Sequence, residues 1–404
     1  MKTPTDIRPA AGRLRRGLRH FLAFTLALIG CFVAVIEFRL IGDAIERAGV
    51  TAFYTQPADA AAGDPGTIIR REELIGVPFD ARAWRVMYRT TDVNGDPVIS
   101  TGIVIVPLGP APDGGRTVLA WGHPTTGSAL DCAPSYGFDP YIGIEGMRVM
   151  LARGYTVVAT DYVGMGTDGP DSYLVGTTAG NAVLDSVRAA RAIPSAQASA
   201  SVVLWGHSQG GQAALFAAER APSYAPELTV EAVAVAAPAA DLPALMSDHL
   251  DDVSGVTIGS YAFNAFAQVY SDRGANLEDI LTPQAREILP EMTELCLLSN
   301  LDRLHEIADP VVGHFVTQDP TEVEPWATLL TENSAGGTTF DAPLFVAQGL
   351  ADELVLPAAT EQFVQHEKQQ GMDVTLHEVK VATHGTIAYL ALPALWDWLN
   401  QQGV

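Results

Sequence analysis

The sequence predicts an α/β fold in which helices cover both faces of a mostly parallel β-sheet. Short apolar runs bounded by Gly, Asp or Pro recur along the chain, and such runs are typical of fully buried parallel strands. Segments with helical periodicity lie between these runs, and this alternation indicates a doubly covered sheet. Between residues 238 and 341 helical periodicity continues without a convincing strand. We therefore expect one α/β core with a helical insertion.

Two antiparallel strands should open the core. Residues 84–91 and 98–106 alternate in polarity and carry β-branched side chains. Asn94 and Gly95 lie between these two segments, and this dipeptide is the strongest short signal for a β-hairpin. The first two core strands are therefore predicted to pair directly.

The remaining strands and helices should follow in alternation. The expected buried strands are residues 117–121, 156–160, 202–205, 230–236 and 344–347. The expected helices are residues 179–191, 212–220 and 358–369. An alternating strand at residues 374–381 and an apolar helix after it end the core.

The chain is thus predicted to have three parts. Residues 1–50 hold a basic segment, an apolar segment and a linker, residues 51–237 and 342–404 form the core, and residues 238–341 form the insertion.

Four aromatic residues of the insertion fall near one helical face: Tyr261, Phe263, Phe266 and Tyr270. We interpret them as ordinary core residues of the insertion. The alternative is a lid that presents these rings to an apolar substrate.

Composition excludes several classes of protein. The chain has 404 residues with 24 Lys and Arg against 47 Asp and Glu, a net charge of −23, so a nucleic-acid-binding surface is not expected. With 48% hydrophobic and 18% charged residues, the chain can bury a large core. Its three cysteines lack CxxC spacing, which argues against a structural zinc site.

The amino terminus has the pattern of an export segment. An uncharged apolar run at residues 21–36 follows a segment whose only acidic residue is Asp6. The basic residues of that segment are Lys2, Arg8, Arg13, Arg15, Arg16 and Arg19. Positive charge before an apolar run directs the rest of the chain across the membrane, so the body is expected outside the cytoplasm. The run is long for a signal peptide and shorter than the ~20 residues of a spanning helix. A cleaved signal on a secreted protein and a retained membrane anchor both remain open.

A nucleophile motif follows the predicted strand at residues 202–205. Gly206, His207, Ser208, Gln209 and Gly210 form the pattern G-x-S-x-G before the helix at residues 212–220. A nucleophilic serine in a sharp strand-to-helix turn needs small flanking residues, because neighbouring backbone packs against the turn. The amino terminus of the following helix also favours negative charge beside the serine. The motif therefore predicts Ser208 as a nucleophile.

The base and the acid should follow the last strands in the order Ser, acid, His. His384 comes directly after the strand at residues 374–381, whereas His377 lies within it. Asp352 follows the preceding strand, with Glu353 as the adjacent alternative. We therefore expect His384 and Asp352 to lie at the same end of the sheet as Ser208.

An oxyanion hole requires two backbone N–H donors, one of them from Gln209. The second should come from residues 122–127, the loop after an early strand. Pro124 has no N–H, so the donor is Thr125, Thr126 or Gly127.

These motifs together resemble those of the fungal and bacterial secretory lipases typified by Candida antarctica lipase A. The likeness runs from residue 53 to the end of the chain, and its most specific segments are residues 53–54, 88–91, 129–136, 223–228 and 352–355. The resemblance implies an α/β-hydrolase fold: a doubly covered, mostly parallel sheet with a helical cap, or lid, that holds an acyl-binding tunnel.

The resemblance also implies the roles of single residues. It implies Ser208 as nucleophile, Asp352 as acid, His384 as base, and main-chain donors at Thr126 and Gln209. A further implication is a disulfide between Cys132 and Cys296, which export to an oxidising compartment would permit.

The expected function is that of an exported serine hydrolase that cleaves carboxylic esters, a lipase or carboxylesterase, through an acyl-enzyme. We expect a small-molecule or lipid ester as substrate and no cofactor, metal or nucleic acid. A membrane is expected as a partner only if the amino-terminal segment is retained. An amidase, a peptidase or a polyester hydrolase could use the same triad. The alternative from another class is a non-catalytic surface protein on a hydrolase scaffold.

Overall fold

The computed structural model describes residues 51–77, 80–137 and 139–404. The predicted export signal or membrane anchor at residues 21–36 lies outside these residues. Residues 54–404 form one compact unit, and all elements below belong to it. None of the helices in the described ranges has the length and apolar character needed to cross a membrane.

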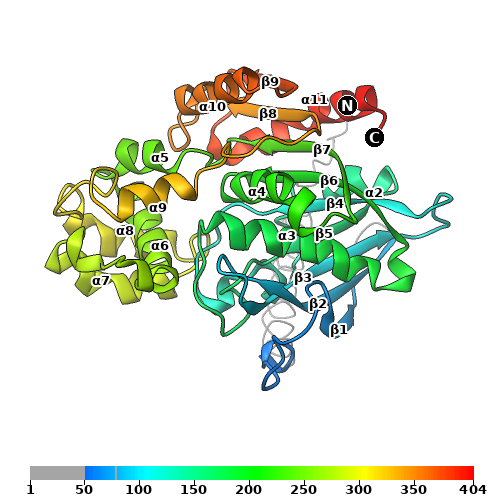
Figure 1. Cartoon of the computed structure of the whole chain (residues 1–404), viewed down its shortest axis with the longest axis horizontal. Helices are drawn as coiled ribbons and strands as arrows, with labels where there is room; N and C mark the ends of the chain where they lie inside the picture. The colour runs from blue at the N-terminus through cyan, green and yellow to red at the C-terminus, as the bar shows by residue number, and fades with distance from the viewer. Residues whose placement is uncertain (1–50, 78–79, 138) are drawn as a thin grey trace, which may run out of the picture. The chain divides into compact units, whose positions relative to one another are not determined.

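A nine-stranded sheet forms the centre of this unit, in the order β1-β2-β3-β5-β4-β6-β7-β8-β9 (Figure 1). Its strands are β1 Ile68–Leu74, β2 Ala81–Thr91, β3 Pro97–Pro107, β4 Arg116–Gly122, β5 Thr156–Thr160, β6 Ala198–His207, β7 Thr229–Ala236, β8 Leu344–Gly349 and β9 Val374–Val379. The pairs from β1 to β5 are antiparallel, and those from β5 to β9 are parallel. The sheet is therefore mostly parallel with an antiparallel edge, as predicted.

The hairpin forms at the expected place. β2 and β3 pair from Ala81 opposite Pro107 to Thr91 opposite Pro97. In the connecting loop Gly95 has a φ of +82°, a conformation that glycine adopts at low cost.

The sequence did not predict β1, which lies at the edge of the sheet. Its residues, IIRREEL, are partly or fully exposed along the whole strand, so it lacks the apolar run that marks buried strands. Charged side chains on an edge strand oppose pairing with another chain.

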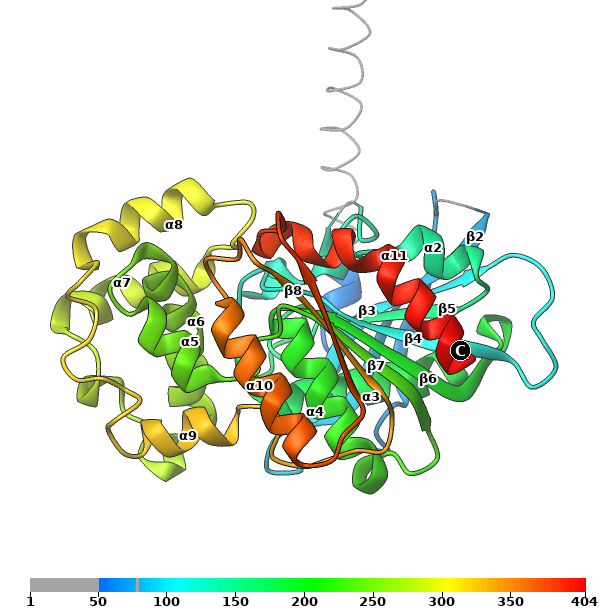
Figure 2. The same cartoon turned by 90° about the horizontal axis from the view of Figure 1, so that it is seen from above.

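Helices cover both faces of the sheet (Figure 2). One face holds α3 Gly176–Arg191, α4 Gln209–Tyr224 and α10 Pro357–Gln369, and the other holds α2 Met147–Ala152 and α11 His384–Gln402. Side chains of β4 alternate between the two layers: Val118 and Ala120 pack in one, Leu119 and Trp121 in the other. The helix α2, only six residues long, was not predicted.

Between β7 and β8 the chain forms the helical insertion, drawn at the left of Figure 1. Its helices are α5 Leu242–His249, α6 Val253–Val269, α7 Pro283–Glu294, α8 Leu301–Ala308 and α9 Trp326–Glu332. The short 3-10 turns of the unit are η1 Leu130–Cys132, η2 Pro134–Tyr136, η3 Pro194–Ala196, η4 Ser271–Arg273, η5 Leu277–Asp279 and η6 Asp309–Val311.

The insertion has its own apolar core. Tyr261, Phe263, Phe266 and Tyr270 are buried within it, which agrees with their interpretation as ordinary core residues. The core also takes in Tyr173 from the α/β part, so the insertion packs directly on the sheet domain.

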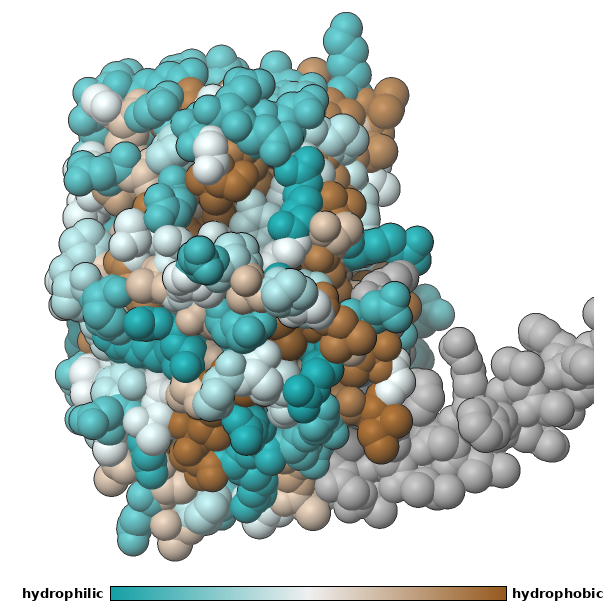
Figure 3. Space-filling view, turned by 90° about the vertical axis from the view of Figure 1, so that its right-hand side faces the viewer, coloured by the Kyte–Doolittle hydropathy of each residue, from teal (hydrophilic) through white to brown (hydrophobic). Residues whose placement is uncertain are grey.

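The outer surface mixes polar and apolar side chains. On the face drawn in Figure 3, the apolar side chains gather mainly toward the right-hand edge. Exposed large apolar residues of the molecule include Ile142, Leu298 and Tyr389, and these three line one pocket.

Candidate active site

Ser208 occupies the turn between β6 and α4. Its φ of +56° and ψ of −119° are strained for a residue with a side chain. A Cβ on Gly206 would lie 2.0 Å from the Gly210 carbonyl oxygen, and a Cβ on Gly210 would lie 1.9 Å from that of Gly122. Both glycines are therefore required by the close approach of neighbouring backbone, as the motif predicted.

The structure brings Ser208, His384 and Asp352 together. His384 Nε2 lies 2.9 Å from Ser208 Oγ, and His384 Nδ1 lies 2.9 Å from Asp352 Oδ2. Because Nδ1–H donates to the carboxylate, Nε2 carries the lone pair that accepts the Ser208 hydroxyl proton. Ser208 follows β6, Asp352 follows β8 and His384 follows β9, and the carboxyl ends of these parallel strands meet at one edge of the sheet.

Backbone donors hold the Asp352 carboxylate in place. Its Oδ1 accepts hydrogen bonds of 2.9 Å from the Leu354 N–H and 3.0 Å from the Val355 N–H. Oδ2 is thereby directed to His384. The adjacent Glu353 is exposed, and it is Asp352 that contacts His384.

His249 connects the insertion to the loop that carries Asp352. Its Nδ1 lies 2.6 Å from Asp252 Oδ2 and its Nε2 lies 2.7 Å from the Leu354 carbonyl oxygen. Burial raises the pKa of Asp252, but the hydrogen bonds from His249 and from the backbone N–H groups of Gly255 and Ser254, with the charge of His249, together outweigh burial, so the pKa is lowered. Sequence reasoning did not find the contact with Leu354, because the two residues are far apart in the chain.

His207, beside the nucleophile, packs against the ring of His384 with 5.0 Å between ring centroids. Its Nδ1 lies 3.0 Å from Glu145 Oε2, and both side chains are buried. Glu145 belongs to no recognisable motif, so the sequence offered no signal for it. The pair therefore supports the His384 ring from one side.

The two predicted oxyanion donors lie on adjoining segments. Gln209 is the first residue of α4, where backbone N–H groups lack helical partners. The loop after β4 touches this helix where Gly122 meets Gly210. In that loop the Thr126 carbonyl oxygen accepts from the Leu297 N–H at 2.8 Å, which fixes Thr126 against the insertion.

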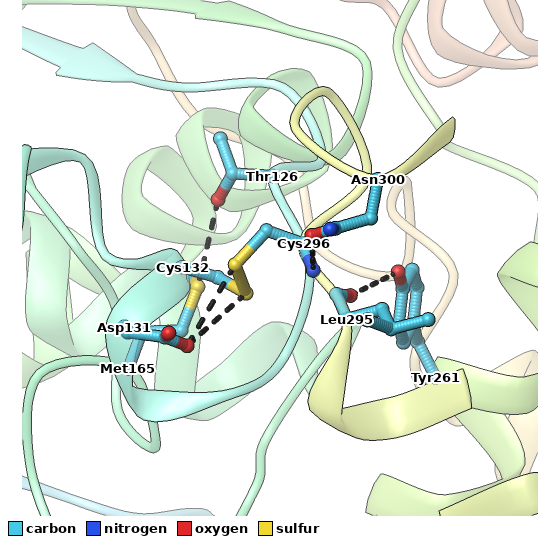
Figure 4. Close-up of a disulfide and its surroundings, with 8 residues drawn as sticks. All are labelled: Thr126, Asp131, Cys132, Met165, Tyr261, Leu295, Cys296 and Asn300. Carbon is cyan, nitrogen blue, oxygen red and sulfur yellow. Dashed lines mark hydrogen bonds between the residues drawn. A yellow bond between two sulfur atoms is a disulfide. The ribbon is translucent and has the colours of Figure 1, made fainter. Parts of the chain in front are cut away.

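A disulfide also joins the segment after β4 to the insertion (Figure 4). Cys132 and Cys296 are bonded across 164 residues of sequence, with their Cα atoms 5.2 Å apart. Asp131 Oδ1 lies 4.0 Å and 3.8 Å from the two sulfur atoms. In the described part of the chain, these three residues are the group that most resembles a metal site. Because both sulfurs are oxidised, however, the group offers no thiolate ligand.

A narrow cleft of about 10 Å³ borders Ser208, room for about one water molecule. Gln209 and Thr125 line it from the core, and Leu245 and Ile258 line it from the insertion. Ser208 itself is only 7% exposed. The insertion therefore covers the nucleophile.

Comparison with known proteins assigns the family. A family model described as secretory lipase matches residues 142–402. The chain belongs to the secretory lipase family. This membership confirms the resemblance noted in the sequence and makes the protein an ester hydrolase of the lipase and carboxylesterase class. It also indicates secretion.

Individual members of the family are distant in sequence. Lipase 6 of Candida albicans is 26% identical over 385 residues, which cover 86% of this chain and 80% of the relative. A protein of Mycobacterium tuberculosis named a probable inactive lipase is 24% identical over 371 residues, 87% of this chain and 81% of the relative.

Among solved structures, Candida antarctica lipase A in its closed state is similar with a TM-score of 0.73 at 22% identity. The match covers 87% of this chain and 85% of that one. It confirms the α/β-hydrolase fold that the strand and helix pattern predicted.

Proposed function

We propose that the protein cleaves carboxylic esters through an acyl-enzyme on Ser208, with His384 as general base and Asp352 as the acid that orients it. The observation that carries this proposal is the continuous chain of two 2.9 Å contacts from Ser208 through His384 to Asp352. Such a chain activates a serine hydroxyl, because the histidine can accept its proton while the carboxylate stabilises the resulting imidazolium.

In the acylation step, Ser208 Oγ attacks the ester carbonyl carbon and its proton passes to His384 Nε2. The carbonyl oxygen becomes an oxyanion, which the backbone N–H groups of Gln209 and Thr126 would stabilise. When the tetrahedral intermediate collapses, the bond to the alcohol oxygen breaks and His384 returns the proton to it. In deacylation, water takes the place of the alcohol and the same steps release the acid.

The substrate proposed is a small-molecule or lipid ester whose acyl group lies on the side of the insertion. The cleft beside Ser208 is bordered there by Leu245 and Ile258, and apolar side chains favour an acyl chain. Each methylene buried against them contributes up to about 0.8 kcal/mol. Because the cleft is narrow, part of the insertion must shift when an acyl chain enters.

The proposal is tested with p-nitrophenyl esters from acetyl to palmitoyl, and with a p-nitroanilide of matched acyl group as control. We expect ester hydrolysis whose kcat/KM rises from acetyl to longer acyl chains, and much slower anilide cleavage. A steady fall in kcat/KM with each added carbon would contradict acyl binding beside the insertion. Faster cleavage of the anilide than of the ester would indicate that the protein is an amidase or a peptidase rather than an esterase.

A further inference from the structure

A second and much larger pocket, of about 530 Å³, lies beside the loop that carries Thr126. This volume is typical of sites for drug-sized molecules. Ile142 and Leu298 line the pocket and are 79% and 77% exposed, so it reaches the surface. None of its lining residues borders the narrow cleft at Ser208, so the two spaces are distinct.

The pocket lies on the histidine side of the site. Thr126, the proposed oxyanion donor, forms part of its wall. Tyr389 lines it from the second turn of α11, the helix that begins with His384. Glu145 also lines it and contacts His207, whose ring lies against that of His384.

The chemistry of the reaction indicates which part of the substrate lies beside His384. His384 Nε2 must deliver its proton to the oxygen of the departing alcohol, so that oxygen lies beside the histidine when the intermediate collapses. The acyl group, by contrast, stays on Ser208. Resting on the function proposed above, we propose that the 530 Å³ pocket binds the alcohol part of the ester; we name it the alcohol pocket.

The walls of the alcohol pocket define the chemistry of that alcohol. Side chains from several elements make it largely apolar, among them Ile103, Ile144, Ala159 and Leu298. The charged residues on its wall are all acidic: Asp131, Asp139, Glu145 and Asp161. An anionic leaving group is therefore excluded by repulsion. The alcohol is bulky, neutral and mainly apolar.

Two of these acidic groups are engaged with the protein itself. Asp161 accepts hydrogen bonds from the Ser135 N–H at 2.9 Å and from the Thr101 hydroxyl at 2.6 Å. Glu145 is held by His207. Because these carboxylates have protein partners, they shape the wall and leave the apolar side chains as the principal contacts for the alcohol.

Gly143 provides a way to fill the alcohol pocket. It lines the pocket, and a Cβ placed on it meets no atom within 4 Å. Its φ lies outside the left-handed region, so a larger residue fits without backbone strain. Gly337 shares these two properties and does not line the pocket. The test variant is Gly143→Phe, and the matched control is Gly337→Phe. Leu298→Trp narrows the pocket from the insertion side and serves as an independent second variant.

The test varies one half of the substrate at a time. Methyl, cyclohexylmethyl and 2-naphthylmethyl butyrate differ only in alcohols of similar leaving ability, whereas methyl butyrate and methyl decanoate differ only in the acyl chain. In the unmodified protein we expect kcat/KM to rise with the size of the alcohol. Gly143→Phe should lower the ratio of kcat/KM for the naphthylmethyl ester to kcat/KM for methyl butyrate by at least about tenfold. The value of kcat/KM for methyl butyrate itself should change by less than about threefold. Leu298→Trp should act in the same direction, and Gly337→Phe should change neither series.

Other results overturn the assignment. If Gly143→Phe lowers kcat/KM for methyl decanoate and leaves the alcohol series unchanged, the pocket holds the acyl chain. An equal change for every ester, or no change for any, also contradicts the proposal. Loss of all hydrolysis in Ser208→Ala tests the proposed nucleophile separately, so the two proposals can fail independently.

Discussion

The backbone N–H of Leu297 in the insertion donates a 2.8 Å hydrogen bond to the carbonyl oxygen of Thr126. The neighbouring Cys296 is bonded to Cys132, which follows the same loop. Two adjacent residues of the insertion therefore hold the segment that carries a proposed oxyanion donor. The position of this donor depends on the insertion as well as on the sheet.

We predict that removing the disulfide destabilises the protein and slows its hydrolysis of esters. The double variant Cys132→Ser/Cys296→Ser should lose about 2–5 kcal/mol of unfolding free energy, because the bond closes a long loop. Its kcat should fall as well, since Thr126 is held less firmly. Urea unfolding and ester kinetics measure the two effects. Equal stability and kcat in the double variant and the unmodified protein would show that the bond has neither role.

The Thr126 side chain should matter little to catalysis. Among the residues that the structure describes, its hydroxyl has only a weak contact, with the sulfur of Met165 at 3.6 Å, and the proposed donor is the backbone N–H. Thr126→Ala should therefore keep kcat within about threefold. A loss of about 10²–10³-fold, typical of a deleted oxyanion donor, would instead assign the donor to the hydroxyl.

Asp352 and Glu353 offer a matched pair of neighbouring carboxylates. Asp352 is 3% exposed and hydrogen-bonded to His384, whereas Glu353 is exposed. Asp352→Asn should lower kcat by about 10⁴-fold, because the amide favours the wrong histidine tautomer. Glu353→Gln should leave kcat unchanged. Comparable losses in the two variants would mean that the orienting acid is misassigned.

The raised pKa of Glu219 should make the stability of the protein depend on pH. Burial, reinforced by the nearby Glu367, raises its pKa from 4.5 to about 7, although a hydrogen bond from the Gly336 N–H opposes the shift. Between these values the folded state retains a proton that the unfolded chain has released, so stability falls as pH rises through this window. Glu219→Gln removes the titration and keeps the acceptor for Gly336.

Relative to the unmodified protein, Glu219→Gln should have an unfolding free energy about 1–3 kcal/mol higher near pH 8 and the same unfolding free energy near pH 4. Urea unfolding at both pH values measures the difference. A constant difference at the two pH values would show that Glu219 does not titrate in this range.

The catalytic candidates could be predicted because each follows a strand with a clear sequence pattern. Ser208 lies in a motif whose glycines are required by backbone contacts, and His384 and Asp352 follow the last strands in the chain order of the fold. Their convergence is a property of parallel strands, which end at the same edge of a sheet.

The supporting contacts could not be predicted in the same way. Glu145 contacts His207, and His249 contacts the Leu354 carbonyl, each far away in the sequence. Neither Glu145 nor His249 belongs to a periodic or spaced pattern. The strand β1 was missed for a related reason, since its polar residues stay at the sheet edge and bury no apolar face. Such features depend on tertiary packing rather than on local sequence.

The most direct test of the proposed acyl-enzyme is covalent trapping by a p-nitrophenyl alkylphosphonate, followed by mass spectrometry of the intact and the digested protein. The phosphonate forms a stable analogue of the tetrahedral intermediate on an activated serine. We predict one phosphonyl group per molecule, on Ser208, with inhibition in proportion to labelling and no label in Ser208→Ala. Labelling of another residue, or full ester hydrolysis by Ser208→Ala, would contradict the account.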